Sequence, residues 1–302
     1  MKDISIIFIS IFLESLPFLI LGSLISSIIE TFIKDEQLEK IIPKNKILGS
    51  LVGVILGFFI PACDCAVIPV SKRLIKKKVP INVALSFMLS SPIINPVVLL
   101  STYYAFYKTN PKIFWYRLLY GIIISLIIGI IMGIIFEKQQ VLEEKKTDEH
   151  SEKLCHHCHH NRSPKNKILS IIKHTANDLF EVVKYLMFGA LIASIIQVLL
   201  PRNIITIMNN NKILSTLILM IFAYLISLCS TSDSFIGKSL LSSFSEQSII
   251  AYLLLGPMID IKNTMVLLGN YKKNFVLILI TLIFMTIFIF SMLVVKIWKI
   301  NI

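Results

Sequence analysis

Two cysteines flank one aspartate in the stretch FFIPACDCAVIPV. Cys63 and Cys65 are soft donors when they are deprotonated, and Asp64 between them supplies a carboxylate. Pro61 and Pro69 stand on either side of the triplet, where each removes a backbone donor and disfavours a continuous helix. We therefore expect an unwound segment that presents two thiols, a carboxylate and free backbone groups.

A third cysteine, Cys229, is followed by Ser230, Thr231 and Asp233. If the two halves of the chain pack face to face, three sulfurs and the carboxylates of Asp64 and Asp233 line one cavity. Such a cavity suits a thiophilic solute, either a trivalent arsenic or antimony species or a soft metal ion. The alternative is that the cysteines are small apolar residues that pack in a core.

Two further polar positions interrupt apolar sequence. Asn95 stands between Pro92 and Pro96, and Asp260 occupies the matching position of the second half, two residues before Lys262. Ionisable residues within a membrane are candidates for a substrate or proton site. The alternative is a kink stabilised by Asn95, with Asp260 and Lys262 forming an ion pair near the membrane interface.

Glu14 and Glu181 form a third pair, 167 positions apart in similar sequence. Both are candidates for coupling transport to protons. The alternative is that Glu14 marks a helix start or pairs with another helix. Glu181 has Lys184 three residues later, a spacing that places both side chains on one helix face.

The segment CHHCHH supplies soft and borderline metal donors within a polar linker. Its candidate ligands are Cys155, His156, His157, Cys158, His159 and His160. Zinc or copper is the expected metal there, although a flexible tract that binds metal incidentally has the same composition. No other cofactor is required by any motif.

The composition describes the elements that must position these residues. Hydrophobic residues make up 55% of the 302 residues and charged residues only 16%, so lipid must surround much of the chain. Backbone groups in lipid must bond to one another, which favours helices. Eight apolar runs are expected to form an all-α polytopic membrane protein with about eight transmembrane helices, at about 4–33, 47–62, 81–107, 113–136, 168–200, 213–229, 249–268 and 275–297.

The runs form an internal repeat. Glu14 matches Glu181, Cys63 matches Cys229 and Pro92 matches Pro257, at offsets of 167, 166 and 165 residues. We predict two transmembrane repeats of four helices each, 1–136 and 168–302, joined by the polar linker 137–167. Paired interrupted helices of this kind are typical of secondary transporters, with a substrate site near the membrane midplane.

The net charge of +12 does not indicate nucleic acid here, because basic residues commonly flank the helices of membrane proteins. Basic residues at 72–78 and 138–173 predict that both termini and the linker are cytoplasmic. The sequence GKS at 237–239 lacks the first glycine of a phosphate-binding loop, because position 232 is a serine, so no feature supports an ATP-driven pump.

The sequence IPACDCAVIPVSKRLIKKKVPINVALSFMLSSPIINP, together with LGPMIDIKNTMVLLG, resembles the predicted bacterial permeases of the YcgR/YraQ type. These are related to the organoarsenical (methylarsenite) efflux permeases. The resemblance covers nearly the whole chain except the linker. It implies a multi-pass permease of the bacterial inner membrane that carries a small inorganic or organometalloid solute, and Cys63 and Cys65 match the C-x-C pattern thought to handle a trivalent substrate.

Secondary-active efflux of a soft solute is therefore the leading hypothesis, and no enzymatic activity is expected. The alternatives are a membrane thiol-redox protein and a non-transporting membrane subunit. A homo-oligomer or a membrane partner is compatible with each.

Overall fold

The computed structural model describes residues 2–32, 43, 45–60, 63–136, 141–142, 164–199 and 212–300. These residues are almost entirely helical, which confirms the expected all-α class, and their isolated β-bridge joins Leu142 to Tyr271. In chain order the helices are α1 (Lys2–Phe32), α3 (Lys46–Phe59), α4 (Asp64–Lys76), α5 (Ile81–Ile94), α6 (Pro96–Phe106), α7 (Lys112–Ile135), α9 (Pro164–Leu199), α10 (Lys212–Ile226), α11 (Ser230–Leu240), α12 (Glu246–Met258), α13 (Ile261–Asn270) and α14 (Lys273–Ile300).

Among the described residues, six helical segments are long and apolar enough to cross a membrane, so the protein is a multi-pass membrane protein. They are Asp3–Ile29, Ile81–Phe106, Lys112–Ile135, Thr175–Leu199, Glu246–Asn270 and Lys273–Leu293. The expected number was about eight, and the difference lies in the second and sixth apolar runs. These runs form α3 and α10, which have 14 and 15 residues, whereas a full crossing needs about 20.

Two of the six segments are interrupted helices, as predicted. The chain breaks between α5 and α6 at Asn95 and between α12 and α13 at Asp260. Asn95 Oδ1 accepts a hydrogen bond from the Val97 amide at 3.0 Å, and Asp260 Oδ1 accepts one from the Asn263 amide at 2.6 Å. Pro96 adds a fixed φ at the first position of α6. Each break is therefore set by an N-cap side chain that begins a new helix.

The short helices α3 and α10 are each followed by a break and a second short helix. Cys63 is the N-cap residue of α4, and Cys229 is the N-cap residue of α11. The expectation that the chain is unwound as far as Pro69 was wrong, because α4 begins at Asp64 and Pro69 lies inside it. The first four amides of a helix have no partner within it, so a proline just beyond them removes a single hydrogen bond.

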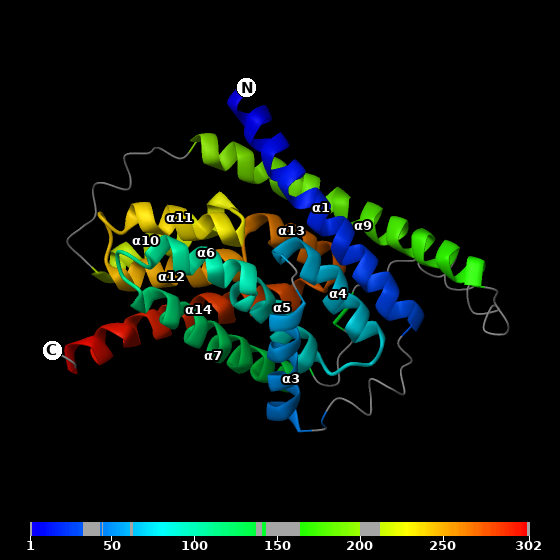
Figure 1. Cartoon of the computed structure of the whole chain (residues 1–302), viewed down its shortest axis with the longest axis horizontal. Helices are drawn as coiled ribbons and strands as arrows, with labels where there is room; N and C mark the ends of the chain where they lie inside the picture. Colours follow the sequence, from blue (N-terminus) through cyan, green and yellow to red (C-terminus); the bar gives the residue numbers. More distant parts are fainter. Residues whose placement is uncertain are drawn as a thin grey trace.

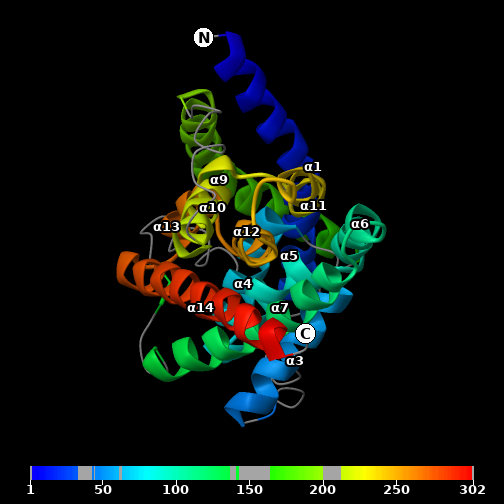
Figure 2. The same cartoon turned by 90° about the vertical axis from the view of Figure 1, so that its left-hand side faces the viewer.

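Helices α5 and α12 form the centre of the molecule, and nearly all of their residues are buried. Helices α3 and α7 pack against α5, while α10 and α14 pack against α12. A helix that is apolar on every side must be covered on every side, which explains this central position. The two views in Figure 1 and Figure 2 show the long helices α7 and α14 below this centre.

The two longest helices, α1 and α9, lie side by side along one side of the molecule (Figure 1). Gly22 brings α1 against α4, because a Cβ atom at Gly22 would lie 2.7 Å from the Ala66 Cα. Gly189 brings α9 against α13 in the same way, with a Cβ atom 2.9 Å from the Lys262 Cα. Small residues let membrane helices approach closely, and here they hold α1 and α9 against the two interrupted segments.

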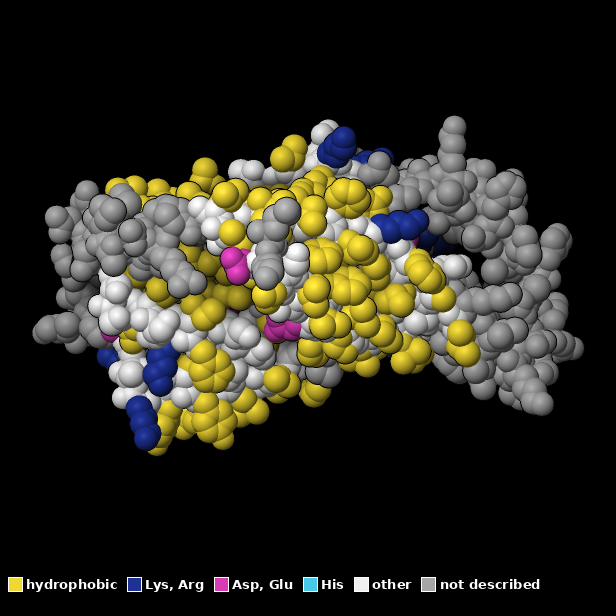
Figure 3. Space-filling view, turned by 90° about the horizontal axis from the view of Figure 1, so that it is seen from above, with side chains coloured by type: hydrophobic (Ala, Val, Ile, Leu, Met, Phe, Trp, Pro, Cys, Tyr) yellow, Lys and Arg dark blue, Asp and Glu magenta, His cyan; other side chains and the backbone are white. Residues whose placement is uncertain are grey.

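Hydrophobic side chains cover much of the outer surface. Figure 3 shows them over most of the described part of one face, with the few lysine and arginine side chains away from its centre. Trp115, Phe188 and Leu277 are each at least 60% exposed, which a water-soluble protein would rarely tolerate in such numbers. Lipid contact accounts for this surface.

Candidate functional site

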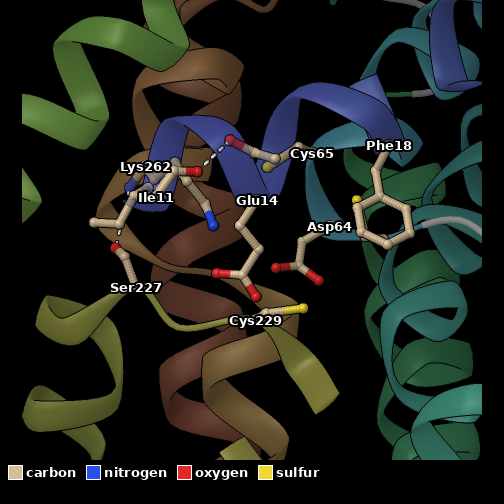
Figure 4. Close-up of a pocket in the computed structure, with 10 residues that line it drawn as sticks. Ile11, Glu14, Phe18, Asp64, Cys65, Ser227, Cys229 and Lys262 are labelled. Atoms are coloured by element: carbon tan, nitrogen blue, oxygen red, sulfur yellow. Dashed lines mark hydrogen bonds between the residues drawn. The ribbon is translucent and has the colours of Figure 1, made fainter. Parts of the chain in front are cut away.

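A pocket lies where α1 passes the N-terminal ends of α4, α11 and α13 (Figure 4). Its cavity volume is about 20 Å³, which is room for about one water molecule. Its walls are Ile11, Glu14, Ser15, Phe18, Cys63, Asp64, Cys65, Ser227, Cys229 and Lys262. The chain breaks before α4, α11 and α13 therefore bring residues from both halves to one place.

Three free thiols line this pocket, from two breaks that are distant in the sequence. Cys65 is 2% exposed, and its Sγ lies 3.7 Å from the Asn263 Oδ1. Cys229 Sγ lies 3.4 Å from the Thr231 Oγ1, and Cys63 is partly exposed. The sequence predicted that Cys63, Cys65 and Cys229 share one cavity, and the structure brings them together there.

Cysteines hold the N-cap positions of α4 and α11, but their side chains do not cap the backbone amides. Neither Cys63 nor Cys229 makes a capping hydrogen bond, although each holds the N-cap position of its helix. Unpaired amides and the positive end of a helix dipole both favour negative charge. Asp64 and Asp233 lie in the first turns of α4 and α11 and Asp260 caps α13, so all three predicted aspartates lie at helix starts, which favour negative charge.

Asp64 is buried in the pocket wall, 6% exposed, and its Oδ1 accepts a hydrogen bond from the Ser230 hydroxyl at 2.5 Å. Glu14 points into the same pocket from α1 (Figure 4). The alternative that Glu14 marks a helix start is wrong, because α1 begins at Lys2 and passes through Glu14 near its middle. A long stretch of apolar residues on both sides of Glu14 carries the helix well before and beyond it.

Lys262 adds a cation to the pocket. Its Nζ lies 3.4 Å from the Asp260 Oδ2, so the ion pair expected of these two residues is present. Both side chains are almost fully enclosed, and Asp260 contributes to the pocket only through Lys262. Ser227, in the same wall, has a φ of 52°, a left-handed conformation that costs a non-glycine residue about 1 kcal/mol or more.

Like Asp260, the predicted substrate residues Asn95 and Asp233 lie outside the pocket wall. Asn95 is buried and caps α6, which supports the interpretation of it as a kink residue. Asp233 is 2% exposed and lies in the first turn of α11, where its Oδ1 accepts the Tyr252 hydroxyl at 3.1 Å. The pocket therefore combines Asp64 with Glu14 and not with Asp233.

Glu181 lies in a different environment from Glu14. Its Oε2 is 2.9 Å from the Lys72 Nζ, which also donates to the Asn270 Oδ1 at 3.0 Å. This contact joins α9 to α4 and α13. It also corrects the expectation that residue 72 belongs to a cytoplasmic loop, because Lys72 lies inside α4 with only 12% of its side chain exposed.

The Cys/His segment of the linker, 155–160, lies outside the described residues. Within the described ranges, no group of three or more His, Cys, Asp and Glu side chains is arranged to hold a metal ion. The three thiols and Asp64 thus share a pocket without forming a ready-made metal centre.

The sequence analysis missed Arg117. This residue of α7 is fully buried, and its Nη1 donates to the Thr102 and Ser234 hydroxyls at 2.8 Å each. A lone arginine inside an apolar run was the available signal. Its partners are hydroxyls that lie far away in the sequence, so the run itself gave no indication of what Arg117 contacts.

Comparison with known proteins agrees with the membrane architecture. The model of the ArsP_1 family, described as a predicted permease, matches residues 1–296. The YcgR protein of Bacillus subtilis is 40% identical over 288 residues, which cover 95% of each chain. A Streptococcus mutans protein, named as a candidate two-component membrane permease complex subunit, is 37% identical over 272 residues, covering 90% of this chain and 88% of that protein. No solved structure is a significant match. The chain belongs to the ArsP_1 family of predicted permeases.

Proposed function

We propose that the protein is a secondary-active permease of the bacterial inner membrane that exports a soft solute through the pocket in Figure 4. The observation that carries this proposal is the meeting of Cys63, Cys65 and Cys229 in one pocket. The chance that three free thiols from two distant chain breaks meet by packing alone is low, and interrupted helices are typical places for transport sites.

The pocket chemistry favours a trivalent arsenic or antimony species, or a soft metal ion. A trivalent arsenic hydroxide exchanges with a thiol so that one As–S bond forms, one As–O bond breaks and the thiol proton leaves in water. Exchange with Cys63 or Cys229 passes the arsenic from one sulfur to another and returns a proton to the first. Release is the reverse of the binding step, in which water breaks the As–S bond, the As–O bond forms again and the thiol regains its proton. Glu14 and Asp64 accept hydrogen bonds or balance charge beside the thiols, and Lys262 supplies the opposite charge.

A two-repeat organisation supports alternating access in this permease. The succession α3, α4, α5, α6, α7 recurs as α10, α11, α12, α13, α14, with Cys63 and Cys229 at matching N-cap positions. In transporters built this way, one repeat moves against the other around a central site. We further propose that both termini and the linker 137–167 are cytoplasmic, and that zinc or copper binding by the linker is separate from the transport site.

A second subunit is the specific alternative to a self-sufficient permease. The name of the Streptococcus mutans relative describes a two-component membrane permease complex. We propose that this chain also works with another membrane protein, and that the pocket described above belongs to the solute-binding component.

Uptake into everted membrane vesicles tests the leading proposal. Cells expressing the chain supply the vesicles, which receive methylarsenite, arsenite, antimonite, Cu(I) or Zn(II). We expect one species to accumulate with the wild-type protein and to fail to accumulate with Cys63→Ala/Cys65→Ala/Cys229→Ala. The matched control, Cys155→Ala/Cys158→Ala, removes linker thiols and should transport normally.

Equal accumulation by the wild-type protein and the triple variant would overturn the role of the pocket thiols. Accumulation that requires a co-expressed second membrane protein would favour the two-component form. Cycling of Cys63 and Cys65 between dithiol and disulfide, without any solute movement, would favour the thiol-redox alternative.

A further inference from the structure

A polar network leads from the pocket into the apolar interior, away from the thiols. Hydrogen bonds join Asp64, Ser230, Arg117, Ser234 and Thr102, which come from α4, α6, α7 and α11. Asp233 of α11 and Tyr252 of α12 form a separate hydrogen-bonded pair, which adjoins these residues through the charge interaction of Asp233 with Arg117. No residue of this network is more than 7% exposed. Burying polar groups this deeply is costly, so a network that crosses five helices calls for a function.

Asp233 is the incomplete member of the network. Its Oδ1 accepts the Tyr252 hydroxyl, whereas its Oδ2 is fully enclosed and has no hydrogen-bond partner among the described residues. Gly256 makes room for this second oxygen, because a Cβ atom there would lie 2.7 Å from the Oδ2. The oxygen therefore faces the backbone of α12 in a position that admits a hydrogen atom but no side chain.

Arg117 is the cation nearest to this carboxyl within the network, yet its hydrogen bonds go to neutral acceptors. Its Nη1 binds the Thr102 and Ser234 hydroxyls, and its Nη2 donates to the Ser230 carbonyl at 3.3 Å. Its Nε has no hydrogen-bond partner within the described part of the chain. A buried guanidinium beside an ionised carboxylate would be expected to bind it directly. The observed partners of Arg117 therefore fit a neutral, protonated Asp233.

We propose that Asp233 is a proton-binding site, separate from the solute pocket, whose charge is sensed by Arg117 and passed to Asp64 through Ser230. Protonated Asp233 leaves Arg117 on the Ser230 carbonyl, where Ser230 also holds Asp64 through its hydroxyl. Loss of the proton to water leaves a carboxylate that attracts the guanidinium. The Arg117 Nη2 then leaves the Ser230 carbonyl, Ser230 shifts, and the hydrogen bond from its hydroxyl to the Asp64 carboxylate changes.

The surroundings of Asp233 favour a proton over a metal cation. The titratable or charged groups that act on Asp233 are Arg117 from α7, Tyr252 from α12, Asp64 from α4 and Asp260 at the start of α13, while α6 contributes only hydroxyls. Hard metal cations such as calcium and magnesium need several oxygen ligands. A proton needs only the one free oxygen of Asp233.

The link to solute movement rests on the proposed permease function, but the proton site can be tested without any solute. The full chain is purified into lipid nanodiscs, and infrared difference spectra are recorded between low and high pH. We expect the carbonyl band of a protonated carboxylic acid to disappear as the pH rises. Asp233→Asn, which keeps an oxygen to accept the Tyr252 hydroxyl, should lack this band, whereas the control Glu246→Gln should retain it.

If Asp233→Asn does not fold, isotope labelling identifies the band as that of an aspartate, and retention of the band in Asp64→Asn and in Asp260→Asn assigns it to Asp233 among the buried aspartates described. Aspartate carrying a heavy carboxyl carbon should shift the band in the wild-type protein. An unshifted band, or a band that Asp233→Asn retains, would overturn the proton site. A band that responds to sodium at constant pH would overturn it in favour of a cation site.

The link to the pocket has its own readout. The carboxylate band of Asp64, identified by its loss in Asp64→Asn, should shift in the same pH step as Asp233. Ser230→Ala should abolish that shift and leave the Asp233 band in place. A shift that persists in Ser230→Ala, or that is absent from the wild-type protein, would overturn the relay. Failure of every solute in the vesicle assay would affect none of these results.

Discussion

Matching residues of the two halves lie in different surroundings. Glu14 of α1 faces an open pocket with three thiols, whereas Glu181 of α9 is paired with Lys72 between helices. Asn95 caps α6 without charge, whereas Asp260 caps α13 and holds Lys262 in the pocket wall. Similar sequence thus placed one glutamate in the pocket wall and the other in an ion pair between helices. The reason is that α1 and α9 pack on α4 and α13 respectively, which are not corresponding helices.

The comparison predicts its largest effect at the two glutamates. Glu14→Gln should abolish most transport of the solute found in vesicles while leaving the melting temperature unchanged, because Glu14 faces the pocket and makes no ion pair with another described residue. Vesicle uptake and thermal unfolding in detergent measure the two effects. If Glu14→Gln transports normally while Glu181→Gln does not, then Glu181, and not Glu14, is the glutamate that transport requires.

Glu181→Gln should lower stability because it leaves Lys72 without its anion. Part of the pair is exposed, so the expected loss is about 2 kcal/mol, below the range for a fully buried pair. Thermal unfolding measures it. The double variant Lys72→Met/Glu181→Gln should lose less stability than the sum of the losses in Lys72→Met and Glu181→Gln. A loss in the double variant equal to that sum would contradict the pairing.

The two glycines give a smaller and more selective effect. Gly22→Ala forces α1 away from the Ala66 backbone, and Gly189→Ala forces α9 away from Lys262, each at a cost of about 1–3 kcal/mol. Because α1 carries Glu14, Gly22→Ala should also weaken solute binding. Gly237→Ala is the control, since the nearest atom to its added Cβ is the flexible end of Leu253 at 3.2 Å. Equal losses of stability in all three variants would show that the close approach of α1 to α4 and of α9 to α13 does not cause the loss.

The smallest effect is expected at Asn95. Asn95→Ala removes the cap of α6 and should cost about 1 kcal/mol, whereas Asn95→Asp keeps a capping oxygen and should cost less. Unfolding temperatures measure both variants. Loss of transport at unchanged stability would instead place Asn95 on the solute path, as first predicted from its position between two prolines.

Much of the fold was readable from composition and local pattern. Long apolar runs predicted membrane helices, and the prolines with Asn95 and Asp260 predicted where two of them break. The breaks before α4 and α11 were also expected, but the effect of Pro69 was overestimated. Helix propensity predicts that a proline disfavours a helix. It does not include the position of the proline, and near the start of a helix the free-energy cost is small.

The candidate site was predicted in part for the same reason. Thiols and carboxylates stand out in an apolar sequence because of their functional groups. The sequence therefore indicated five residues of the pocket, namely Cys63, Cys65, Cys229, Asp64 and Glu14. The partners of Arg117 could not be found this way, because Thr102 and Ser234 are ordinary residues until packing brings them to a guanidinium.

The sequence alone determined that lipid surrounds much of the chain, that the fold is helical, where helices break and that thiols lie at two of those breaks. These properties depend on each residue's own hydrophobicity, backbone preference and functional group. The tertiary structure decided that Glu14 faces the pocket while Glu181 braces a helix, and that Asp233 lies in the interior beside Arg117. Those outcomes depend on which helices touch, and contacts between distant segments are settled only by packing all of them at once.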